Sequence, residues 1–95
     1  MSSTLATAYF SNLVIAEVGV LRSNIFRFKG FIRAKDGKED MFSFYTVGRL
    51  AEACEKALHY GKIVCIPHSD MKRVRGKDIF RVDRIIFGGH CFSSD

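Results

Sequence analysis

The strongest constraint on the fold is a double change of hydrophobic period between Phe42 and Pro67. In MFSFYTV, from Met41 to Val47, apolar and polar residues alternate as in a half-buried strand. From Arg49 to Tyr60, apolar residues recur at the spacing of an amphipathic helix, and Gly61 suits a C-terminal cap. KIVCI then predicts a short strand that Pro67 ends or marks as an edge. The chain therefore places one short helix between two strands.

The flanking segments predict three further strands. Tyr9–Val20 is β-branched and apolar, with a bend or bulge expected at Gly19. Ile25–Ala34 alternates with period two, and Asp36-Gly37 predicts a hairpin turn after it. After a basic loop from Ser69 to Lys77, Asp78–Phe87 predicts the last strand. The predicted fold class is all-β with one helix: a five-stranded OB-fold Greek-key barrel with the helix between strands 3 and 4. An α+β sandwich with one helix on a meander stays open as the alternative.

Charge decides which face of the second predicted strand is exposed. Phe26, Phe28 and Ile32 share one face, and the other face carries Arg27, Lys29, Phe31 and Arg33. Burying three unpaired cations would cost far more than exposing two phenylalanines, so the basic face should point outward. By the same alternation, Phe42 and Phe44 should lie in the core, while Met41 and Tyr45 should point outward.

Length and composition predict one domain over residues 1–95, with an ordered core at about 8–89. A core of this size is small, so we expect a homodimer or homotetramer. Apolar runs fall far short of the ~20 residues of a membrane helix, and the N-terminus lacks the basic residue of a secretory signal. We therefore expect a cytoplasmic protein with no membrane partner.

The three cysteines match neither a disulfide framework nor a metal knuckle, which favours reduced thiols and predicts no metal site and no cofactor. The formal charge of +5 is unevenly placed, because twelve of the fifteen basic residues lie in the segments 22–40 and 69–84. Such clustering is typical of a protein that binds a polyanion.

The run FYTVGRLAEACEKALHYGKIVCI resembles the bacterial and phage single-stranded-DNA-binding proteins. In that family a strand leads through an apolar residue and glycine into a K/R-L-A-E helix, then a glycine and a V-x-I strand. The matching residues here are Gly48, Arg49, Leu50, Ala51, Glu52, Gly61, Val64 and Ile66. The resemblance extends more weakly over residues 8–89 and implies a non-catalytic OB-fold protein that binds single-stranded DNA in replication or recombination.

Three features depart from the family pattern. The chain has no tryptophan, and Met41 stands where the family usually has one on its binding face. His68 replaces a glycine that follows the fourth strand, and the acidic C-terminal tail of bacterial members is absent from the ending HCFSSD. These departures leave open a second function: an OB-fold protein–protein interaction module of a replication or other assembly, with weak or no nucleic-acid binding.

Binding single strands without sequence preference requires cations that follow the phosphates and flat side chains that stack on bases. We predict a nucleic-acid-binding surface made of Arg27, Lys29, Phe31, Arg33, Tyr45, Arg49, Lys72, Arg73, Arg75 and Lys77. For Phe31, packing against a partner subunit or over the barrel mouth stays open, and for Tyr45 a place in the barrel wall. RNA is not excluded as the ligand, because stacking does not read the 2′-hydroxyl.

We do not expect an enzyme. The sequence contains no glycine-rich phosphate loop, no recognisable pair of catalytic carboxylates and no Ser or Cys with a positioned His partner.

Overall fold

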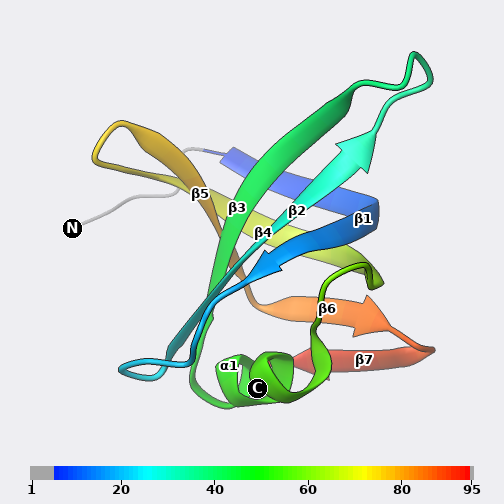
Figure 1. The fold of residues 1–95 in the computed structure, drawn as a ribbon. Helices are drawn as coiled ribbons and strands as arrows, with labels where there is room; N and C mark the ends of the chain where they lie inside the picture. Colours follow the sequence, from blue (N-terminus) through cyan, green and yellow to red (C-terminus); the bar gives the residue numbers. More distant parts are fainter. Residues whose placement is uncertain (1–5, 95) are drawn as a thin grey trace.

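The computed structural model describes residues 6–94, which form seven strands and one helix (Figure 1). In chain order these are β1 (Ala6–Val18), β2 (Ile25–Arg33), β3 (Glu39–Val47), α1 (Gly48–Ala57), β4 (Ile63–Val74), β5 (Lys77–Val82), β6 (Arg84–Phe87) and β7 (His90–Ser93). No helix in this part of the chain is long and apolar enough to cross a membrane.

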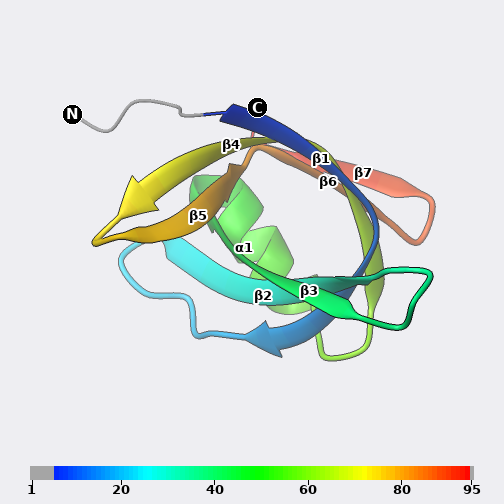
Figure 2. The same cartoon turned by 90° about the horizontal axis from the view of Figure 1, so that it is seen from above.

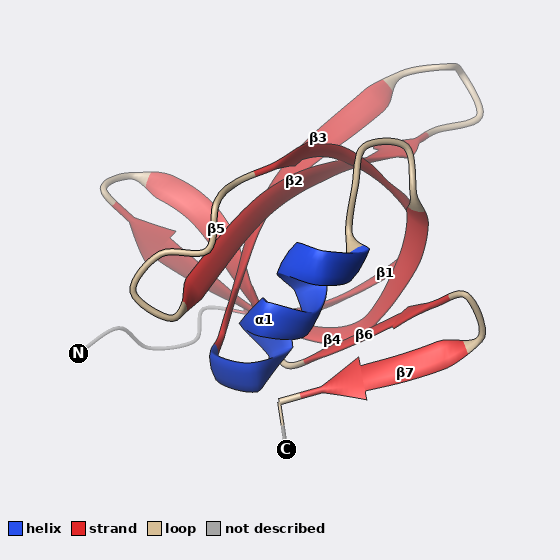
Figure 3. Cartoon of the chain, turned by 60° about the horizontal axis from the view of Figure 1, so that its bottom comes forward, coloured by secondary structure: helices blue, strands red, loops and turns tan. Residues whose placement is uncertain are grey.

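Strands β1 to β5 close into a barrel. They lie in the order β1-β2-β3-β5-β4, and β4 pairs back onto β1. The contact between β3 and β5 is parallel, and the other barrel contacts are antiparallel. Figure 2 looks down into this ring of strands, and Figure 3 shows α1 across its lower end. A closed five-stranded barrel with a helix between β3 and β4 is the predicted OB-fold, and the alternative α+β sandwich is wrong.

Aromatic side chains fill the barrel interior. Phe10 makes edge contacts with Phe42, Phe44 and Phe80, with ring centroids 4.9, 5.0 and 5.1 Å away. Phe28 stacks on Phe44 at 5.1 Å. These contacts confirm the faces predicted for β2 and β3, although Phe42 at the barrel rim is only half-buried.

The apolar face of α1 closes the core from below. Leu50, Ala51 and Cys54 are buried, as the helical spacing predicts. Burial raises the pKa of the Cys54 thiol to about 12, so this thiol stays protonated and acts as a packing group. The helix is shorter than predicted, because Leu58 takes an extended conformation and its backbone N–H donates to the Cys54 carbonyl. The predicted cap at Gly61 is therefore wrong, although Gly61 has a positive φ of 87°.

The predicted end of the fourth strand at Pro67 is wrong, because β4 continues to Val74. Two residues of β4, at positions 67 and 68, lie opposite Tyr9 of β1, so proline occupies a bulge where its missing N–H disrupts little of the ladder. Beyond the bulge, Ser69 is buried and its hydroxyl donates to the Ala8 carbonyl at 3.1 Å. The segment predicted as a basic loop is consequently a β-hairpin.

The predicted fifth strand divides near Asp83 into β5 and β6. β5 belongs to the barrel, whereas β6 pairs with β4 at Cys65 and carries the hairpin partner β7 beside it. β7 lies beyond the range of about 8–89 expected for the core. The predicted bend at Gly19 is also displaced, since the irregular positions of β1 fall between Phe10 and Leu13 and between Ile15 and Glu17.

Candidate nucleic-acid interface

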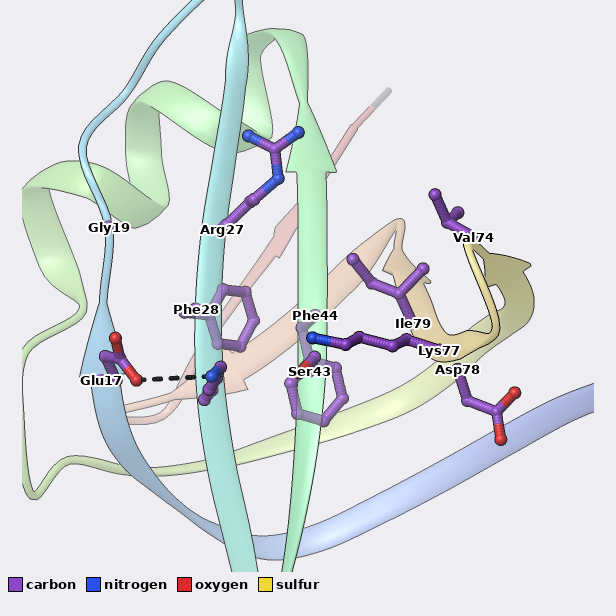
Figure 4. Close-up of a pocket in the computed structure, with 11 residues that line it drawn as sticks. Glu17, Gly19, Arg27, Phe28, Ser43, Phe44, Val74, Lys77, Asp78 and Ile79 are labelled. Carbon is purple, nitrogen blue, oxygen red and sulfur yellow. Dashed lines mark ion pairs between the residues drawn. The ribbon is translucent and has the colours of Figure 1, made fainter.

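An open hollow of about 470 Å³ lies between the outer face of β2 and β3 and the hairpin formed by β4 and β5. Arg27 and Lys29 line it from β2, Ser43 lines it from β3, and Lys77 lines it from the hairpin. Figure 4 shows the Lys77 side chain extending from the hairpin toward Ser43 and Phe44. The hollow therefore has basic side chains on both of its sides, where the acidic Glu17 and Asp78 also line it. Its volume lies in the range of ligand-binding clefts.

Tyr45 lies in a line of outward residues next to this hollow. It is the cross-strand partner of Arg27 on one side and of Arg81 on the other. Direct partners in a sheet point to the same face, so the half-buried Tyr45 is flanked on this face by Arg27 and by Arg81, whose Nε lies 3.4 Å from Asp83 Oδ1. Sequence analysis missed Arg81 because only the parallel pairing of β3 with β5, which no local pattern announces, brings it beside Tyr45.

The hairpin of β4 and β5 carries most of the net charge of the chain. Residues 63–82 include five basic and two acidic residues, which gives a net charge of +3 out of the +5 of the whole sequence. Arg73 Nε donates to Asp78 Oδ1 at 3.0 Å, so this predicted cation already has an acidic partner. Lys72 is half-buried opposite Ile79, and Arg75 and Lys77 lie exposed at and beside the turn.

The turn of this hairpin has an unusual composition. Val74 pairs with Lys77, and the two residues between them, Arg75 and Gly76, have positive φ angles of 54° and 78°. This is the pattern of a type I′ turn, which favours Asn, Asp or Gly at both central positions. A bulky arginine in the left-handed region is strained, and the turn holds its charge at the tip of the hairpin.

The remaining predicted residues lie apart from the first hollow. Phe31 and Arg33 line a second hollow of about 500 Å³ together with Asn12 and Val14 of β1. Arg33 is bound to Glu39 at 2.6 Å, and its guanidinium carbon lies 5.8 Å from the Phe31 ring centre. Arg49 is exposed in the first turn of α1 and lines neither hollow.

Metal-ligating side chains do not gather in the part of the chain described. Within residues 6–94, no three His, Cys, Asp or Glu side chains lie close enough together to hold a metal ion.

Comparison with known proteins finds a similarity in structure but none in sequence. No family model matches the sequence, and no curated protein matches it significantly. Among solved structures, it is similar to the crystal structure of a small single-stranded DNA-binding protein from Streptomyces coelicolor. The TM-score is 0.66 at 18% identity, over 86% of this chain and 92% of that chain. The likeness is one of fold.

Proposed function

We propose that this chain binds single-stranded DNA without catalysis and largely without sequence preference, and that it acts in replication or recombination. The observation that carries the proposal is the first hollow, which has basic side chains on both sides and an aromatic ring beside it. The name of the Streptomyces coelicolor protein, which shares the fold, supports single-stranded DNA as the ligand.

Each part of the hollow has a role in this proposal. Arg27 from the barrel wall and Lys77 from the hairpin bind phosphates on opposite sides of the strand, and Lys72 and Arg75 extend this track along the hairpin. An unpaired base stacks on Tyr45, where it also lies close to the two flanking guanidinium groups. Lys29 contributes less, because Glu17 lies 3.7 Å from its ammonium group.

Binding of labelled oligo(dT) across a salt series tests this function. Anisotropy of a fluorescent oligonucleotide is suitable because the chain contains no tryptophan. The logarithm of affinity should fall linearly with the logarithm of salt concentration, with a slope of about −0.7 for each phosphate neutralised. Lys77→Gln should make the slope shallower by about 0.7. Lys56→Gln, an equal charge change on the exposed side of α1, is the matched control and should leave the slope unchanged.

Parallel titrations with oligo(rU) and with a duplex of equal length define the ligand class. We expect the single-stranded DNA to bind more tightly than the duplex. A chain that binds none of the three and purifies free of nucleic acid would contradict the proposal and favour the protein–protein interaction module.

A further inference from the structure

Four apolar side chains form a continuous row across the outer face of the barrel. Val14 of β1 is the direct partner of Ile63 on β4 and of Phe31 on β2, and Phe31 is the partner of Met41 on β3. Direct partners project from the same face of a sheet, so the order across the surface is Ile63, Val14, Phe31, Met41. The two ends of this row are open to solvent, with Met41 55% and Ile63 60% exposed.

Ion pairs border the row on both sides. Along β2, Lys29 lies two residues before Phe31 and pairs with Glu17 of β1 at 3.7 Å. Arg33 lies two residues after Phe31 and pairs with Glu39 of β3 at 2.6 Å. An apolar centre within a polar border of balanced charge is the anatomy of a protein–protein interface. DNA would instead require unneutralised cations beside the row.

We propose that this row is the contact surface of a homodimer, in which two copies pack face to face about a two-fold axis parallel to the strands. Such an axis reverses the strand order, so Phe31 of one copy meets Val14 of the other and Met41 meets Ile63. The contact is thus self-complementary, as a two-fold interface requires. The second hollow, which Val14 lines, leaves room beside it for the incoming Phe31 ring.

Charge selects this axis over the alternative. With the axis parallel to the strands, Lys29 of each copy lies opposite Glu17 of the other. With the axis along the row, Lys29 would lie opposite Arg33 of the second copy, and like charges in contact are destabilising. The interface therefore uses the bordering charges as well as the apolar row.

Solution mass tests the surface. Light scattering of the wild-type chain should give twice the 10.7 kDa of one chain at micromolar concentration, and Met41→Lys should give the mass of a single chain. Tyr60→Lys is the matched control, because Tyr60 is another large exposed side chain, 77% exposed and outside the row, and this variant should keep the dimer mass. A wild-type monomer, or a Met41→Lys variant that stays dimeric, would overturn the proposal.

A mixing experiment tests the orientation. Glu17→Lys and Lys29→Glu should each weaken the dimer, because each variant alone brings like charges together across the interface. In an equimolar mixture the two variants should restore the dimer mass, since each now meets opposite charges on the other. Circular dichroism confirms that both variants are folded. If both are folded and their mixture remains monomeric, the proposed axis is wrong.

A last measurement separates this surface from the DNA site. With an oligo(dT) of about eight nucleotides, short enough for one barrel, Ile63→Ala should lose the dimer but keep the salt slope of binding, because Ile63 belongs to the row and not to the proposed DNA site. Lys77→Gln should keep the dimer and lose part of the slope. If Ile63→Ala keeps the dimer mass and loses affinity for the oligonucleotide, then nucleic acid covers the row and the proposed dimer surface is wrong.

Discussion

The sheet of β1, β2 and β3 and the hairpin of β4 and β5 are both rich in basic residues, yet they differ in net charge. The three strands carry three basic and three acidic residues, a net charge of zero. Residues 63–82, the hairpin, carry five basic and two acidic residues, a net charge of +3. The comparison shows that a basic cluster in a sequence becomes a basic surface only where its cations outnumber the acidic residues that strand pairing brings beside them.

The largest expected effect comes from neutralising the hairpin. Replacing Lys72, Arg75 and Lys77 together by Gln should make the salt slope for oligo(dT) shallower by about 2, because each cation contributes about 0.7. This corresponds to a loss of affinity of about 100-fold at 0.1 M salt relative to 1 M salt. A triple variant with the wild-type slope would show that the hairpin does not follow the phosphates.

The reverse change on β1 and β3 sharpens the same comparison. Glu17→Gln combined with Glu39→Gln removes the acidic partners of Lys29 and Arg33. The freed Lys29, which lines the first hollow, should tighten binding of the short oligonucleotide and steepen its slope by up to about 0.7, whereas Arg33 lies apart from that hollow and should add little. Unchanged binding would mean that Lys29 lies outside the DNA path even when it is unpaired.

The extent to which sequence predicts each region follows from the range of the contacts involved. Alternation along β2 and β3 and the helical spacing of α1 are local, so the barrel and its inner face were predictable. The ion pair of Lys29 depends on Glu17, twelve residues earlier, and the place of Arg81 beside Tyr45 depends on a parallel pairing 36 residues apart. The sequence predicts a loop where β4 and β5 form the hairpin. Pro67 and the dense charge mask the alternation of buried and exposed residues along β4 that buries Ser69.

Close packing between β1 and β2 provides the next prediction. Gly30 is buried opposite Ile15, and a Cβ atom there would lie 2.8 Å from Leu13 Cγ and 3.0 Å from the Val14 carbonyl oxygen. Because one obstacle is backbone, β1 itself would have to move, and overpacking of this kind costs about 1–3 kcal/mol. Gly30→Ala should therefore lower the free energy of unfolding in urea by about 2 kcal/mol.

Thr46→Val is the control for Gly30→Ala. It also changes an inward-facing residue of the β2–β3 sheet, but it should not lower the stability. The buried Thr46 Oγ1 finds no hydrogen-bond partner among residues 6–94, and valine has nearly the same shape. Removing an unpaired hydroxyl should leave stability unchanged or raise it. A Gly30→Ala variant as stable as the wild type would show that β1 and β2 can separate at this point without loss.

The smallest expected effect concerns the hairpin turn, where stability and binding should change in opposite directions. Asparagine adopts the left-handed conformation of Arg75 more readily, so Arg75→Asn should raise the free energy of unfolding by about 1 kcal/mol. The same variant should make the oligo(dT) slope shallower by about 0.7, because one cation is lost. Arg75→Lys keeps both the charge and the strain, so it should match the wild type in both measurements.

The β6–β7 turn has glycine at both left-handed positions, Gly88 and Gly89, so this chain does use residues that suit such turns. If Arg75→Asn loses stability, the turn is not strained. If it gains stability and keeps the slope, Arg75 does not bind phosphate. A gain in stability with a loss of slope would mean that the turn holds a strained arginine because DNA binding uses its charge.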